Sequence, residues 1–228
     1  FFLDLGPVRN ANEKYFKDKS KIWNEYVAHN TYDDYWKARN IRQHLKNIKP
    51  AVLVVGGWFD AEDLFGALNT YQSIEKQNSR NRNYLIMGPW THGAWAAREW
   101  TRYVTQDFGS NVNGWFRETE ASFFNYFLMD KGTFNLPEAT IFETGTNQWK
   151  TYDAWPPHNT AEQKIYFQPE GGLSFSAPES TGSFREYVSD PSQPVPYTSK
   201  YQGSRDQEYM ALDQRFASTR TDVVTYKT

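Results

Sequence analysis

Two ionisable side chains stand a few positions beyond two apolar runs of the sequence, and together they could carry acid–base chemistry. Asp60 follows the run at residues 51–55, and His92 follows the run at residues 84–87. If these runs are neighbouring parallel strands, both residues lie at the sheet edge where open α/β sheets bind their ligands. A carboxylate that accepts the ring proton of a histidine orients the imidazole as a general base. The spacing therefore predicts an Asp60–His92 pair that transfers protons.

Each of these residues also has a structural explanation. Asp60 could cap the helix that follows the first strand, and His92 could be a solvated residue of a loop rich in Gly and Pro. Their joint position at two consecutive strand ends favours catalysis over both explanations. We interpret the other three histidines as structural, because they fall on polar helices or in a proline-rich loop: His29, His44 and His158.

Two further carboxylates, Glu62 and Asp63, lie within three residues of Asp60 in a segment rich in apolar side chains. Crowded acids beside apolar surface repel one another and lose hydration unless a cation or protons relieve them. A divalent metal or a substrate ammonium group would do so, although no histidine or further acid stands at ligand spacing nearby. Alternatively, these acids complement the dipole of a helix that begins here.

The elements that would position these side chains form a strand–helix–strand unit. Residues 51–55 are all apolar and rich in valine, which is typical of a strand buried on both faces of a parallel sheet. Residues 64–74 carry an apolar stripe at helical spacing, and residues 84–87 repeat the strand pattern. A longer helix is predicted over about residues 112–131. The pattern therefore predicts a parallel α/β sheet covered by helices.

The regions on either side of this unit have different residue patterns. Residues 1–48 carry helical patterns over about 15–27 and 32–48, and Pro50 ends the second. From about residue 136, short β-rich runs alternate with Gly, Pro, Asn and Ser turns, which is typical of an all-β sandwich or jelly roll. The runs are 140–143, 164–167, 173–175, 185–188 and 222–226. We predict a helical segment over 1–48, an α/β domain over 49–134 and a β domain over 135–228, with the boundary near 131–137.

Composition excludes several classes of function. The 228 residues carry a net charge of −2, which offers no basic surface to a nucleic acid. The chain has no cysteine, which excludes a disulfide framework, a thiolate nucleophile and an iron–sulfur cluster. Its apolar runs fall far short of the roughly 20 residues that a membrane helix needs. The aromatic content of 18% fits aromatic-lined clefts and interfaces or a core built from rings. We predict no cofactor, no metal and neither a nucleic-acid nor a membrane partner.

Three ordered motifs resemble one family of serine hydrolases. They are Gly-Trp-Phe-Asp-Ala-Glu-Asp at 57–63, Gly-Pro-Trp-Thr-His at 88–92 and Asp-Gln-Arg-Phe-Ala-Ser-Thr-Arg at 213–220. The family groups cocaine esterase, X-Pro dipeptidyl-peptidases and α-amino acid ester hydrolases, often described as glutaryl-7-aminocephalosporanic acid acylases. The likeness implies an α/β-hydrolase domain with a helical cap, followed by a jelly-roll β domain. It makes Asp60 the acid and His92 the base of a Ser-His-Asp triad, in the chain order of α/β-hydrolases.

The Asp-x-Glu-Asp pattern is similar to the α-amino acid ester hydrolase branch, where the two following acids help to bind the substrate's α-ammonium group. Glu62 and Asp63 match those positions, and aromatic residues nearby would line the acyl pocket: Trp58, Phe59 and Trp90. The resemblance thus implies cleavage of esters or amides of α-amino acids, as in a β-lactam acylase. It also implies a periplasmic or secreted protein that forms homo-oligomers.

The sequence departs from the family because no Gly-x-Ser-x-Gly elbow, which would carry the nucleophile, occurs in it. We therefore expect a C-terminal fragment of an enzyme, inactive or nearly so alone, with the serine and oxyanion-hole groups upstream. One alternative is an X-Pro dipeptidyl-peptidase or a neutral-acyl esterase of the same family. Another is a non-enzymatic module whose β region presents aromatic side chains to a glycan or a protein partner.

Overall fold

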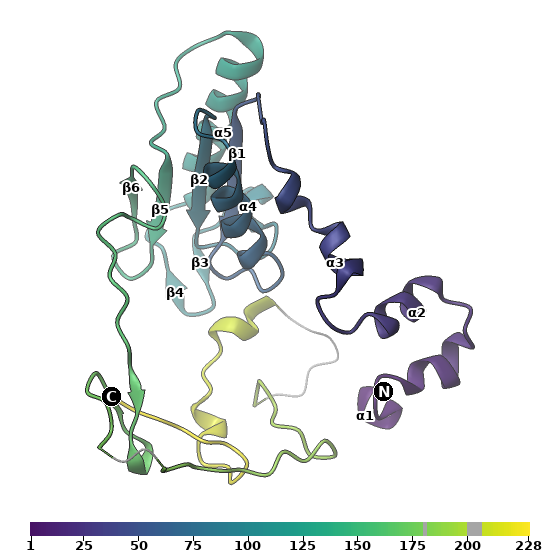
Figure 1. Ribbon diagram of the computed structural model, residues 1–228. Coiled ribbons are helices and arrows are strands. Elements are labelled where there is room, and N and C mark those ends of the chain that lie inside the picture. The colour runs from purple at the N-terminus through teal and green to yellow at the C-terminus, as the bar shows by residue number, and fades with distance from the viewer. Residues whose placement is uncertain (180–181, 200–206) are drawn as a thin grey trace.

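The computed structural model describes residues 1–179, 182–199 and 207–228. Its centre is a four-stranded sheet in the order β1-β2-β5-β6 (Figure 1). The strands are β1 (Val52–Gly57), β2 (Asn83–Gly88), β5 (Ala139–Glu143) and β6 (Gln148–Tyr152). β1, β2 and β5 run parallel, and β6 returns antiparallel to β5. The predicted parallel strand–helix–strand unit is confirmed.

Two helices cover opposite faces of this sheet. α4 (Leu64–Gln77) connects β1 to β2 and buries Tyr71 and Ile74, whereas α5 (Val112–Met129) buries Val112 and Phe116 on the other face. Because successive strand residues point to opposite faces, the strand side chains divide between the two layers. The α4 side holds Val54, Leu85, Met87, Ala139 and Ile141, and the α5 side holds Ile86 and Phe142.

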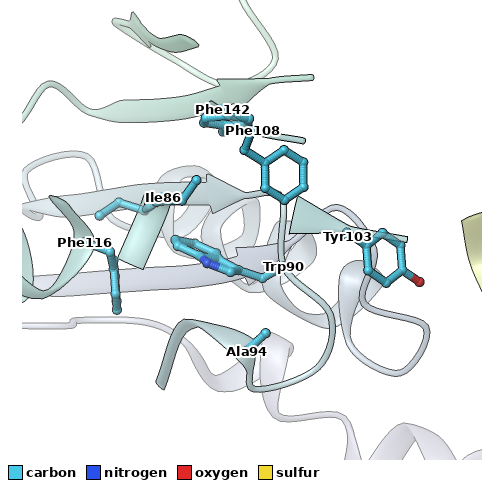
Figure 2. Close-up of a cluster of buried hydrophobic side chains, with 8 residues drawn as sticks. Ile86, Trp90, Ala94, Tyr103, Phe108, Phe116 and Phe142 are labelled. Atoms are coloured by element: carbon cyan, nitrogen blue, oxygen red, sulfur yellow. The ribbon is translucent and has the colours of Figure 1, made fainter. Parts of the chain in front are cut away.

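Aromatic rings build the core on the α5 side (Figure 2). The Trp90 ring is fully buried and lies edge-on to Phe116, with ring centroids 5.1 Å apart. Phe108 and Phe142 form a second edge-on pair at 5.6 Å. Such pairs contribute about 0.5–1.5 kcal/mol each beyond the area they bury. Part of the high aromatic content therefore serves this core.

The first 48 residues form shorter helices than predicted, and in Figure 1 the N-terminal ones extend away from the sheet. The helices are α1 (Phe2–Leu5), α2 (Lys21–Ala28) and α3 (Asp34–Arg39). The helix predicted over 32–48 is wrong in its second half, because Asn40 leaves the helical conformation and accepts the Arg42 N–H through its side chain. None of the helices in the described residues is long and apolar enough to cross a bilayer.

The segment at 140–143, predicted to belong to the β region, lies in the central sheet instead. As β5 it pairs with both β2 and β6, so the sheet continues across the boundary predicted near 131–137. Beyond β6, the described strands are β7 (Tyr166–Phe167) and β8 (Leu173–Ser174), which pair with each other. An isolated bridge joins Gly172 to Lys227.

The strands predicted at 185–188 and 222–226 do not form. The Arg185 guanidinium donates to the Thr225 carbonyl at 2.7 Å, so a side chain occupies an acceptor that a neighbouring strand would use. The remaining short elements of the described chain are the π-helical turn Asn12–Phe16, the 3₁₀ turns Ile41–His44, Ala94–Ala96, Pro169–Gly171, Gln207–Ala211 and Arg215–Ala217, and the strands β3 (Arg102–Tyr103) and β4 (Gln106–Asp107).

Candidate active site

Backbone hydrogen bonds join the loops that follow β1 and β2. Trp58 donates its N–H to the Gly88 carbonyl, and Phe59 donates its N–H to the Trp90 carbonyl, both over 2.9 Å. These bonds continue the parallel pairing beyond the ends of the strands. The two loops therefore leave the sheet together, and each carries one of the predicted catalytic residues.

This close approach requires glycine at the end of each strand. A Cβ on Gly57 would lie 2.2 Å from the Trp90 carbonyl oxygen, and a Cβ on Gly88 would lie 2.3 Å from the Trp90 ring. A side chain at Gly57 would push the two loops apart, and one at Gly88 would displace the Trp90 ring within its own loop. Glycine in a strand often marks such an approach of a second segment.

Asp60 and His92 face each other across the junction of the two loops. His92 Nδ1 lies 3.2 Å from Oδ1 and 3.1 Å from Oδ2 of Asp60. Only 1% of the Asp60 side chain is exposed, against 41% of the His92 side chain. Because a carboxylate accepts from Nδ1, this nitrogen carries the proton and Nε2 becomes the basic nitrogen. The arrangement is a buried carboxylate that orients an accessible imidazole, a geometry in which the imidazole can act as a general base.

Backbone groups hold the Asp60 carboxylate in place. Its Oδ1 accepts the N–H groups of Glu62 at 2.8 Å and of Asp63 at 2.9 Å. Burial raises the pKa of Asp60, but these N–H groups and His92 outweigh burial and bring the pKa below its ordinary value. Asp60 therefore caps the turn at Glu62 and Asp63 and not α4, which begins after Asp63, while its carboxylate also faces His92.

Three carboxylates surround the His92 imidazole. Glu62 Oε2 lies 4.0 Å from Nε2, and Asp63 Oδ2 lies 3.8 Å from Nδ1. The hydrogen bond and charge of Asp60 raise the pKa of His92 against a smaller effect of burial, and Glu62 and Asp63 raise it further. All three carboxylates stabilise the imidazolium that forms when a general base accepts a proton.

We predict that His92 titrates above its ordinary pKa of 6.5, and that Asp60→Asn returns the value toward 6.5. Because the folded-state pKa is raised, the pair stabilises the fold fully below the unfolded pKa, and this stability is lost as the pH rises through the folded pKa. The measurement is an NMR titration of the imidazole Cε1–H in the 228-residue chain, assigned with His92→Gln. If Asp60→Asn left the pKa of His92 unchanged, the result would contradict the observed contact between the two side chains.

The structure separates the aromatic residues predicted to line an acyl pocket. Trp58 donates its Nε1–H to the Phe142 carbonyl at 3.0 Å and packs with the α4-side cluster. Phe59 packs on the other side, with its ring 4.5 Å from that of Tyr103. Trp90 is 0% exposed, and a fully buried ring does not line an open pocket. Trp90 therefore supports the His92 loop from the core, which corrects its predicted role.

A polar residue beneath this site, Asn113 of α5, was not predicted from the sequence. It is 0% exposed, and its Oδ1 accepts the Trp90 Nε1–H at 2.6 Å. The available signal was an amide within the first turn of a helix whose inward face is otherwise apolar. A buried amide must be hydrogen-bonded, so its position alone pointed to a partner.

A second histidine–aspartate pair lies outside the site. His29 Nδ1 is 2.7 Å from Asp33 Oδ2, and the His29 ring stacks on Tyr35 at 4.3 Å. The pair links the end of α2 to the N-cap of α3, which agrees with the structural interpretation of His29. In the part of the chain that the structure describes, no group of three or more His, Asp or Glu side chains is arranged to hold a metal ion.

Two family models match the chain. The X-Pro dipeptidyl-peptidase (S15 family) model matches residues 5–94, which include Asp60 and His92. The X-Pro dipeptidyl-peptidase C-terminal non-catalytic domain matches residues 132–228. The second match begins near the boundary predicted from the sequence, although β5 and β6 of the central sheet lie beyond it.

Two known proteins that are similar to this chain support the matches to the family models. The chain is 25% identical over 220 residues to cocaine esterase of Rhodococcus sp. (strain MB1 Bresler), a match that covers 91% of this chain and 37% of the esterase. Its fold matches the crystal structure of an aminopeptidase from the marine sediment archaeon Thaumarchaeota archaeon, with a TM-score of 0.89 and 30% identity, over 99% of this chain and 38% of that one. The chain thus spans well under half the length of either relative. It belongs to the X-Pro dipeptidyl-peptidase and cocaine esterase family of serine hydrolases.

Proposed function

We propose that Asp60 and His92 are the acid and base of a Ser-His-Asp triad that hydrolyses esters or amides. The observation that carries this proposal is the separation of 3.1 Å between His92 Nδ1 and Asp60 Oδ2, with the carboxylate buried and the imidazole accessible. A module that only presents aromatic side chains to a glycan or a protein has no need of such a pair.

In this mechanism a serine hydroxyl attacks the acyl carbon while His92 Nε2 takes its proton. His92 then donates that proton to the leaving group, and a water molecule activated in the same way releases the acyl group from the serine. Asp60 keeps the imidazole in the required tautomer and stabilises its charged form. Since the sequence has no Gly-x-Ser-x-Gly elbow, we propose that the serine lies outside these 228 residues and that they are inactive alone.

We further propose that the acyl group carries an α-ammonium. Glu62 and Asp63 flank the imidazole within 4.0 Å, and their side chains are 46% and 67% exposed, so both can reach a ligand. Two carboxylates beside the base would hold an ammonium next to the acyl carbon that the base serves. The solved relative is an aminopeptidase, and such an enzyme acts at a free amino end, which supports this choice over a neutral acyl group.

The test compares phenylglycine methyl ester, which carries the α-amine, with phenylacetate methyl ester, which lacks it. The enzyme is the product of the complete reading frame that contains this chain, assayed above the pKa of His92 but with the amine protonated. We expect a higher kcat/KM on the amino ester. After Glu62→Gln with Asp63→Asn, kcat/KM should fall on both esters because the imidazolium loses two stabilising charges, but the loss should be about tenfold larger on the amino ester, equivalent to about 1.4 kcal/mol.

Glu118→Gln removes a comparable charge from the exposed side of α5 and serves as the control. Equal rates on the two esters would refute the ammonium site and favour a neutral-acyl esterase. Rapid release of an X-Pro dipeptide from a chromogenic amide, with slow cleavage of both esters, would favour the dipeptidyl-peptidase alternative.

The family resemblance also motivates a wider proposal for the flanking regions. We propose that residues 1–48 are part of a helical cap and that residues 135–228 include part of a jelly-roll β domain. The match of residues 132–228 to a C-terminal non-catalytic domain supports the second assignment. Export from the cytoplasm and homo-oligomerisation stay predictions from the resemblance.

A further inference from the structure

We infer that Asn113 is a positioning residue for His92, because its side-chain amide clamps the histidine loop on both sides of the imidazole. The inference rests on the proposed function of the Asp60–His92 pair. It concerns how that pair is held in register, and not which group reacts with the substrate.

Three hydrogen bonds form the clamp. Asn113 Oδ1 accepts the Nε1–H of Trp90, two positions before His92, at 2.6 Å. Asn113 Nδ2 donates to the carbonyl of Ala94, two positions after His92, at 2.8 Å, and to the carbonyl of Ala97 at 2.9 Å. Both amide protons and the amide oxygen are thus used, so one side chain fixes the loop before and after the base.

The clamp is itself anchored at the start of α5. Asn111 is the N-cap of this helix, and its Oδ1 accepts the N–H groups of Asn113 at 3.2 Å and of Trp100 at 3.0 Å. Trp100 in turn donates its Nε1–H to the Pro89 carbonyl at 2.6 Å. The first turn of α5 and the histidine loop are therefore tied together at several points.

The surroundings of Asn113 favour a positioning role over simple filling of the core. Trp90 and Ala94 belong to the apolar cluster of Figure 2, and Phe116 of the same cluster lies one turn along α5. A hydrophobic side chain of similar volume would fill this space without the cost of burying an amide. What an amide adds is three directed bonds to a loop whose only helical part is the 3₁₀ turn Ala94–Ala96.

The test is Asn113→Leu in the 228-residue chain, compared with the matched variant Asn83→Leu. Asn83 is also a buried amide, 3% exposed, and it donates to the Tyr71 carbonyl at the opposite end of β2 from His92. We expect the NMR-measured pKa of His92 in Asn113→Leu to fall toward 6.5 and its low-field Nδ1–H resonance to broaden. Asn83→Leu should lower the melting temperature and leave both signals unchanged.

A milder variant keeps the test decisive if Asn113→Leu does not fold. Trp90→Phe retains a ring in the core and removes one of the three bonds, so it should shift the His92 signals in the same direction but less. In the complete enzyme, Asn113→Leu should lower kcat by about 10²-fold with little change in KM, as expected when a catalytic group is displaced by about 1 Å.

The outcomes separate this inference from the proposed function. If the pKa of His92 in the unmodified chain is at or below 6.5 and Asp60→Asn does not change it, the proposed catalytic pair is refuted. If Asp60→Asn changes the His92 titration but every folded clamp variant, Asn113→Leu or Trp90→Phe, leaves it unchanged, the pair stands and the clamp is refuted.

Discussion

Asp60→Asn is expected to lower kcat of the complete enzyme by about 10⁴-fold while the fold around the site persists. The asparagine oxygen can still accept the N–H groups of Glu62 and Asp63, which hold the turn at 2.8 and 2.9 Å. Its amide carries no charge to stabilise the imidazolium and can present a donor to Nδ1, which favours the wrong tautomer. The measurement is the single-turnover rate on an activated ester, with circular dichroism to follow folding.

The second aspartate–histidine pair supplies the control for this experiment. Asp33→Asn makes the same chemical change beside His29, outside the candidate site, and should leave kcat unchanged. A loss smaller than about tenfold for Asp60→Asn would show that His92 does not depend on this carboxylate, and the triad assignment would fail.

Trp90→Ala is expected to have the largest effect on stability, a loss of about 3–5 kcal/mol in the free energy of unfolding. The ring is 0% exposed and packs against Phe116 and Trp149. Its removal leaves a cavity and also deprives the buried Asn113 oxygen of its donor. Urea denaturation followed by far-ultraviolet circular dichroism measures the change.

Trp90→Phe separates the contribution of ring packing to stability from that of the hydrogen bond to Asn113. It keeps most of the ring contact and removes the Nε1–H donor, so we expect a loss of about 1–3 kcal/mol, the range for a buried polar group without a partner. If the two variants were equally stable, ring packing would not be the main contribution of Trp90 to the core.

The centre of the fold and the proximity of Asp60 and His92 could be predicted because both depend on patterns that are local in the sequence. Two apolar runs and the amphipathic stretch between them specify β1, α4 and β2, and parallel pairing then places both loops at one edge. The proximity of Asp60 and His92 follows from that geometry alone.

The placement of β5 could not be predicted in the same way. A short apolar run such as 140–143 looks alike in a parallel sheet and in a β sandwich. Its partner is decided by contacts with β2, where Leu85 lies opposite Ala139, and such contacts leave no local signal. The helix over 32–48 failed for a different reason, because the side chain of Asn40 competes for the backbone N–H of Arg42.

The role of Trp90 was mistaken because its sequence neighbours suggest a site surface. An aromatic residue two positions from a histidine that is predicted to be catalytic is expected to line a pocket. Its direction is set by Asn113, 23 positions away, which accepts its Nε1–H in the core. Which side of a loop faces the solvent therefore depends on a helix that is distant in the sequence.

The border position of β1 has a consequence for how a complete catalytic centre could assemble. Within the described residues, β1 pairs with β2 alone, so its other side is a template for an incoming strand. A strand that paired there in parallel would end at the same edge of the sheet as β1 and β2, where the loops with Asp60 and His92 leave the sheet. A separately produced polypeptide that carries the serine could thus restore hydrolysis by complementation, with main-chain pairing along β1 as the step that unites the two halves.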